Sequence, residues 1–221
     1  MKRFVIPFVV IISLAGIFVF AIRSIYIHPN ETNTHSTKNV LVNNSNYSVA
    51  NTNQTSVILY LPVSDAASRI TKKPFGIYIT PATSPVSPEK FSGFHTGVDF
   101  ETLENEQDTH VEVFAVCDGV VKAKQRVSGY GGVFIQSCTI NNEDVTVLYG
   151  HLALSTISFN TGDTVKPGDS IGLLGAPFSQ DTDGERKHLH LGIHKGVEIN
   201  YKGYVSIESA LSDWIDAEPL L

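Results

Sequence analysis

The sequence has little positive charge and no cluster of it. Its 16 lysines and arginines are outnumbered by 22 aspartates and glutamates, which gives a formal net charge of −6. Proteins that bind nucleic acid normally carry a basic patch, and the lack of one excludes nucleic acid as a partner. A modest acidic balance favours solubility and says little about the substrate.

Helical patterns are also scarce, and no long internal repeat occurs. Only residues 65–70 and 207–215 carry a helical pattern. From residue 57 onward, short apolar runs are broken by Gly, Pro, Asn and Asp, which is typical of strands and turns. The expected strands are 57–61, 76–80, 111–116, 119–124, 133–137, 145–149, 170–174 and 189–194. These patterns predict a mainly β fold, with one antiparallel β domain over residues 57–221.

Residues 4–22 lack any charged side chain and any polar stripe. At about 1.5 Å of rise per residue, a helix of this length is just long enough to cross a bilayer, and a buried core helix would normally keep a polar stripe. We therefore expect an N-terminal transmembrane helix at 1–23 that acts as an uncleaved anchor. The alternative is a removed signal peptide, although the usual A-x-A cleavage pattern is missing.

The charges beside this segment predict its orientation. Lys2 and Arg3 outweigh Arg23, so the amino terminus is expected in the cytoplasm. The protein would then lie in the cell membrane as a single-pass protein with an extracytoplasmic C-terminal domain, or be secreted if the segment is cleaved. Residues 24–56 are rich in Asn, Thr and Ser, and are expected to form a flexible linker.

Cysteine is nearly absent, because only Cys117 and Cys138 occur, each in a strand-like run. If the two runs pair as a hairpin centred near residues 127–128, the two cysteines face each other. A cross-strand disulfide is then a reasonable prediction for an oxidising compartment. Two buried free thiols are the alternative that the sequence leaves open.

Two short segments contain four groups able to bind a divalent metal: His95-Thr96-Gly97-Val98-Asp99 and His188-Leu189-His190. In a strand, side chains at i, i+2 and i+4 share one face, so each pair can converge on one point. Zinc accepts imidazole nitrogen and carboxylate oxygen, and a catalytic site keeps three protein ligands with one position open for water. The four groups are more than the metal needs, which leaves a histidine for chemistry.

A further histidine, His151, lies in the segment Tyr149-Gly150-His151-Leu152 without the spacing of a ligand pair. An imidazole beside a metal can take a proton from water or donate to a developing oxyanion. Together these segments suggest a zinc hydrolase. His110 and His194 belong to none of them and are interpreted as surface or core residues.

The motifs follow one another in the order His95-x-x-x-Asp99, Tyr149-Gly150-His151-Leu152, Gly162-Asp163-x-Val165-Lys166-x-Gly168-Asp169-x-Ile171-Gly172 and His188-x-His190. This order resembles that of the lysostaphin-type zinc metallopeptidases, and the resemblance covers roughly residues 75–193. It implies a small antiparallel β-sheet with a groove over the metal. It also implies that His95, Asp99 and His190 bind one Zn²⁺ ion, while His151 and His188 are catalytic and activate water.

Members of the resembled family cleave peptide bonds of bacterial cell-wall peptidoglycan, often next to glycine or D-alanine. The expected function is therefore that of a membrane-tethered zinc metalloendopeptidase acting on peptidoglycan peptides. The alternative is a non-catalytic relative that binds cell wall or activates a separate amidase. One stretch, residues 176–187, replaces the family's Gly/Thr/Ser-rich loop, and its charged groups are expected to reshape one wall of the groove.

Overall fold

The computed structural model describes residues 58–221. The anchor predicted at 1–23 and the linker predicted at 24–56 lie outside the described residues. Within residues 58–221, no helix combines the length and the apolar character needed to cross a membrane.

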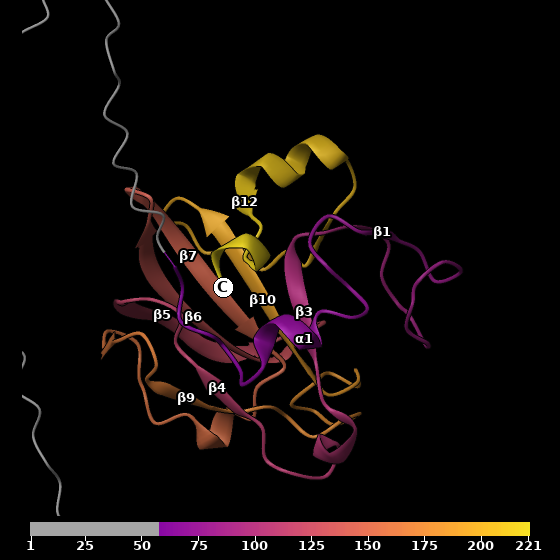
Figure 1. Cartoon of the computed structure of the whole chain (residues 1–221), viewed down its shortest axis with the longest axis horizontal. Coiled ribbons are helices and arrows are strands. Elements are labelled where there is room, and N and C mark those ends of the chain that lie inside the picture. The colour runs from indigo at the N-terminus through magenta and orange to yellow at the C-terminus, as the bar shows by residue number, and fades with distance from the viewer. Residues whose placement is uncertain (1–57) are drawn as a thin grey trace, which may run out of the picture. The chain divides into compact units, whose positions relative to one another are not determined.

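Antiparallel strands form the centre of the domain (Figure 1). Over residues 58–221, the largest sheet has seven strands in the order β12-β10-β7-β6-β5-β8, and β3 pairs with β10 on the same side as β12. The prediction of a mainly antiparallel β fold is therefore confirmed. The bounds are β3 Gly97–Glu101, β5 Gly119–Val127, β6 Gly131–Ile140, β7 Glu143–Gly150, β8 Thr164–Val165, β10 His188–Lys195 and β12 Trp214–Ile215.

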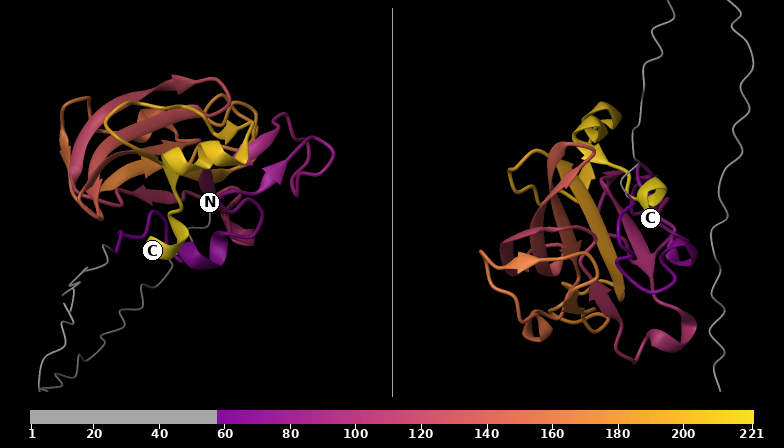
Figure 2. Two further views of the ribbon diagram at one scale, coloured as in Figure 1. Left: turned by 90° about the horizontal axis from the view of Figure 1, so that it is seen from above. Right: turned by 60° about the vertical axis from the view of Figure 1, so that its left-hand side comes forward.

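Two smaller sheets and several short helices surround this sheet. One contains β1 Tyr78–Ile79, β2 Gly93–His95 and β11 Tyr204–Val205, and the other pairs β4 Glu112–Phe114 with β9 Ser170–Leu173. The helices are α1 Ala66–Arg69 and the 3₁₀ turns Glu104–Glu106, Leu154–Thr156, Glu208–Asp213 and Glu218–Leu220. Figure 2 shows the C-terminal end beside the first described residues, where Leu59 N–H donates to the Leu220 carbonyl at 2.7 Å.

Strand β10 separates the apolar core from the face that carries the polar site. Alternate side chains of a strand point to opposite faces, and Leu189, Leu191 and Ile193 belong to the main core while His188 and His190 lie between them. Both sets are buried, so the strand is covered on both faces. Apolar and polar side chains thus alternate along a strand that is buried on both faces, and this places His188 and His190 inside the domain.

Three expected elements differ from the structure. The described part of the predicted strand 57–61 makes single backbone hydrogen bonds to Leu220 and Val116 without a ladder, and it is followed at once by Pro62, which cannot donate to one. The predicted strand 76–80 is reduced to β1. The helix predicted at 207–215 is instead a 3₁₀ turn followed by β12, because Trp214 pairs with His194 of β10.

The hairpin that contains the cysteines has a different register from the predicted one. Val127 pairs with Gly131, so the turn is centred on Gly129, whose φ of +87° favours glycine. Cys117 precedes β5, and an irregularity lies between Val121 and Ala123. The two cysteines nevertheless form a disulfide, with their Cα atoms 6.1 Å apart. The predicted pairing is thus present, although the two residues do not face each other in the predicted ladder.

Candidate metal and catalytic site

Three potential metal ligands, His95, Asp99 and His190, meet at one point. His190 Nδ1 lies 3.0 Å from His95 Nε2 and 3.1 Å from Asp99 Oδ1, and the last two atoms are 3.3 Å apart. Tetrahedral ligands about 2.0–2.1 Å from zinc lie about 3.3 Å from one another, so the three atoms are spaced closely enough to share one ion. The sheet register accounts for the meeting, because Asp99 of β3 faces His190 of β10 directly.

The remaining nitrogen of each histidine ligand has a partner of its own. His95 Nδ1 lies 3.2 Å from the Pro74 carbonyl, which can only accept a hydrogen bond. His95 therefore carries its proton on Nδ1 and leaves the Nε2 lone pair for a metal. His190 Nε2 lies 3.3 Å from the Tyr130 hydroxyl oxygen, so its Nδ1 faces the shared point. Such outer contacts fix the tautomer and ring orientation of metal-binding histidines.

Gly150 explains how Tyr130 reaches this position. Gly150 lies beside His190 in the ladder, and a Cβ there would come within 2.6 Å of the Tyr130 ring. The glycine of the Tyr149-Gly150-His151 motif thus leaves room for the tyrosine to pack over the site. No motif spacing connects Tyr130 to the histidines, so its place in the site has no signal in the sequence.

His151 and His188 lie together beside the three potential ligands. Their ring centroids are 4.2 Å apart, and His188 Nδ1 lies 2.9 Å from the Arg186 carbonyl. His188 Nε2 approaches Asp99 Oδ2 at 3.3 Å. His151 has a φ of +65°, and its Nδ1 is buried without a hydrogen-bond partner among residues 58–221. Buried polar atoms without a partner are rare in native structures, and they often mark a catalytic group or an ordered water.

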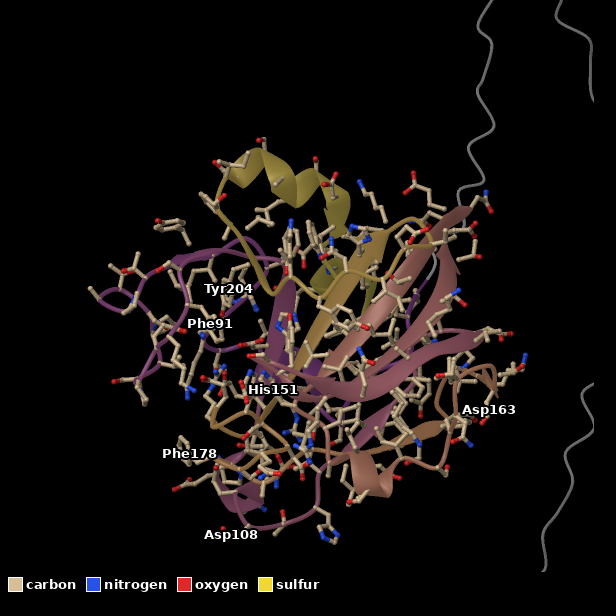
Figure 3. The ribbon with its side chains drawn as sticks, turned by 180° about the vertical axis from the view of Figure 1, so that it is seen from behind. Phe91, Asp108, His151, Asp163, Phe178 and Tyr204 are labelled. Carbon is tan, nitrogen blue, oxygen red and sulfur yellow. A yellow bond between two sulfur atoms is a disulfide. The ribbon has the colours of Figure 1, made fainter. Side chains whose placement is uncertain are left out.

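Four of the five residues border a cavity of about 310 Å³: Asp99, His151, His188 and His190. An aromatic pair, Phe91 and Tyr204, forms part of its wall with ring centroids 5.5 Å apart, and Figure 3 shows this pair on the same side of the domain as His151. Lys73, which also lines the cavity, donates to the Tyr204 hydroxyl at 3.1 Å. The other two histidines of residues 58–221 lie elsewhere: His194 packs on Trp214, and His110 is exposed.

Arg186 is a further charged group in the cavity wall that no motif predicted. Its Nη2 donates to Asp99 Oδ2 at 2.9 Å, and its Nε donates to both carboxylate oxygens of Glu101 at 3.0 and 3.1 Å. Asp99 therefore presents Oδ1 to the other potential ligands while Oδ2 is held by the guanidinium. The only sequence signal was that Arg186 falls in the unusual stretch 176–187.

The charges in the cavity shift the pKa values of its members. Burial by itself would raise the pKa of Asp99, but the surrounding histidines His188 and His95 hold that pKa well below its usual value. Burial lowers the pKa of His151 well below the usual value, and His188 lowers it further. Burial also lowers the pKa of His190 to about 4. Near neutral pH, His151 and His190 are therefore neutral, the form required of a base or a metal ligand.

The pKa of His190 predicts how metal-free stability depends on pH. An unfolded histidine has a pKa of about 6.5. Between that pH and about pH 4, the unfolded chain therefore binds a proton that His190 does not bind in the folded protein. We expect the free energy of unfolding to fall by about 1 kcal/mol per pH unit between pH 6 and pH 4 from this group. Urea unfolding of chelator-treated protein at several pH values measures the slope. A His190→Asn variant, which cannot titrate, should show a smaller slope, and an equal slope would contradict the assignment.

Comparisons with known proteins give both a family and structural neighbours. Residues 93–202 match the family described as Peptidase family M23. No curated protein matches the chain significantly. Similar solved structures include Csd3 of Helicobacter pylori, with 26% identity and a TM-score of 0.42, and a zinc containing peptidase from Vibrio cholerae, with 21% identity and a TM-score of 0.43.

The Csd3 and Vibrio cholerae matches cover 69% and 72% of this chain but 36% and 39% of those chains. This chain thus spans little more than a third of the length of those two proteins. LytU is also similar, with 25% identity and a TM-score of 0.46, over 68% of this chain and 82% of that chain.

Proposed function

Since residues 93–202 place this chain in peptidase family M23, we propose that it is a zinc-dependent endopeptidase that hydrolyses peptide bonds of cell-wall peptidoglycan. The observation that carries the proposal is the convergence of His95 Nε2, Asp99 Oδ1 and His190 Nδ1 beside two further histidines. Three ligands with an adjoining cavity are the donor set of a catalytic zinc site, whereas a structural site normally has four protein ligands.

In this proposal the three ligand residues hold one zinc ion. When bound there, zinc supplies a Lewis acid that polarises a carbonyl and makes water more acidic. The residues are prepared for it, because the Pro74 carbonyl and the Tyr130 hydroxyl hold the two rings with the required nitrogens facing inward. Arg186 holds the second oxygen of Asp99, which favours coordination through Oδ1 alone.

His151 and His188 are proposed as the catalytic histidines. His151 is neutral near pH 7 and lines the cavity, so it can take a proton from an attacking water. His188 is fixed by the Arg186 carbonyl through Nδ1, which leaves its Nε2 in the site beside Asp99. That nitrogen can donate to the oxygen on which charge develops during attack on a peptide carbonyl when the ring is an imidazolium, in which both nitrogens carry a proton.

The test is metal content and cleavage of peptidoglycan peptides by the purified full-length protein. We expect close to one zinc per chain, cleavage detected by mass spectrometry, and loss of cleavage after chelation that returns on adding zinc. A protein that binds zinc and cleaves no peptidoglycan peptide would favour the non-catalytic alternative, in which the same groove binds cell wall or activates an amidase. A protein that binds no zinc would overturn the metal assignment.

The proposed location follows from the N-terminal segment alone. A single-pass anchor at 1–23 and a linker at 24–56 would expose the catalytic domain on the extracytoplasmic side of the cell membrane, within reach of the wall polymer. Fractionation of cells that express the full chain tests this, since an anchored protein stays with the membrane and a cleaved one is released.

A further inference from the structure

Arg186 is one of two cationic side chains that line the cavity, the other being Lys73. Both are largely withdrawn from solvent, with side-chain exposures of 16% and 3%. Each is fixed by carboxylates, Arg186 by Asp99 and Glu101, and Lys73 by Glu89 at 2.5 Å. A buried cation fixed in this way is held in one place, so it can present any remaining donor without first losing conformational freedom.

Arg186 has a donor group left over. Its Nε and Nη2 are the nitrogens that bond Asp99 and Glu101, whereas Nη1 donates to no acceptor among residues 58–221. Nη1 is also not one of the sealed polar atoms without a partner, so solvent can reach it. Two guanidinium N–H groups are thus accessible next to the carboxylate that would bind the metal. A guanidinium matches the geometry of a carboxylate or a phosphate, and of these two groups a peptide carries the carboxylate.

The anionic groups of the cavity do not compete for this donor. Asp99 Oδ1 already contacts His95, and Asp99 Oδ2 already accepts from Nη2 of Arg186. Glu185, the other carboxylate in the lining, lies 3.1 Å from Lys90, which is half exposed at the surface. Two cations and two anions therefore line the cavity, and the carboxylates of Glu89 and Glu101 pair with the same two cations. A divalent metal ion would bring the sum of these charges to zero, so no excess of negative charge would repel an anionic substrate group.

We propose that Arg186 binds a carboxylate of the substrate peptide through Nη1, so that the enzyme selects peptides with a free carboxylate close to the scissile bond. The inference rests on the proposed peptidase function and adds a substrate class to it. Arg186 lies in the stretch 176–187, where the chain departs from the resembled family, so this preference is a property of the present chain.

Two carboxylates of a peptidoglycan peptide could fill this role: the C-terminal one and an acidic side-branch one. The probes are the pentapeptide L-Ala-D-Glu-L-Lys-D-Ala-D-Ala, its C-terminal amide, and the analogue with the glutamate carboxylate amidated. Full-length protein is assayed for kcat/KM on each, and chelator-treated protein is titrated with each by calorimetry. We expect one amide to lose about tenfold or more in both measurements, and the identity of that amide gives the source of the carboxylate.

Variants connect the preference to Arg186. Arg186→Lys keeps a cation beside Asp99 and Glu101 but removes the Nη1 donor. Arg186→Gln removes Nη1 together with the positive charge. In both variants, kcat/KM and affinity for the acid should come close to those for the amide, so that the acid-to-amide ratio of each quantity is about one. Lys90→Ala is the matched control, because it removes a cation at the rim without changing the guanidinium, and it should leave the ratio unchanged.

Several results would overturn the inference. The first is that the unmodified protein binds the acid and both amides with equal affinity. The second is that the acid-to-amide ratio stays unchanged in both Arg186 variants. The third is that this ratio falls as much in Lys90→Ala as in the Arg186 variants. The first comparison needs no variant, so it decides even if the Arg186 variants fail to fold. Selective binding of the acid without cleavage of any peptide would instead reject the peptidase function and support the carboxylate site.

Discussion

His190→Ala is expected to remove zinc from the protein and to abolish peptide hydrolysis. His190 Nδ1 is the atom nearest to both other potential ligands, at 3.0 Å from His95 Nε2 and 3.1 Å from Asp99 Oδ1. Its loss leaves two ligands, one fewer than a catalytic zinc site uses. Removal of a mere outer partner costs about 10–100-fold in metal affinity, so loss of a ligand should cost more than about 100-fold. Competition with a zinc-binding dye measures the affinity.

His194→Ala is the matched control for this experiment. It removes a histidine from the same strand, but His194 packs against Trp214, with ring centroids 4.9 Å apart. Zinc affinity and activity should stay close to those of the unmodified protein. Thermal unfolding of both variants separates loss of the metal site from loss of the fold. Full zinc retention by folded His190→Ala would reject His190 as a ligand.

His151→Ala is expected to lower kcat by about 10²–10⁴-fold while zinc remains bound. The residue lies against His188 and is not one of the three converging ligand residues, so its removal should leave the ligand set intact. Its neutral imidazole is the proposed acceptor of the proton from water, and alanine cannot take that role. Steady-state cleavage of a peptidoglycan peptide and zinc analysis of the same sample provide the two numbers.

The double variant His151→Ala/His188→Ala tests whether the two histidines act as a unit. Residues that cooperate in one step show strongly non-additive losses, so the double variant should be little slower than the slower single variant. His188→Ala should also keep its zinc. The exposed His110→Ala serves as a control for the loss of any histidine. Near-normal activity in His151→Ala, or loss of its zinc, would contradict the proposed division of roles.

The sequence determined the type of fold and the composition of the candidate site. Strand alternation put His188 and His190 on one face, and it put Leu189 and Leu191 into the core. The pairs at i, i+2 and i+4 are local patterns, and local patterns can be recognised without the fold. Four motifs in order then indicated the family, although each motif alone is short. The assignment of roles to the five residues remains a prediction for the variants above.

Only the tertiary structure decided the surroundings of the site, because contacts between residues distant in the chain leave no local signal. Tyr130 meets His190 across 60 positions of sequence, and Arg186 meets Asp99 across 87. The cysteine hairpin also depended on tertiary detail, since glycine at 129 and an irregularity in β5 shifted its register. The sequence by itself specified which side chains could bind a metal. The arrangement of β2, β3 and β10 decided that they meet, and an unpredicted guanidinium lies beside them.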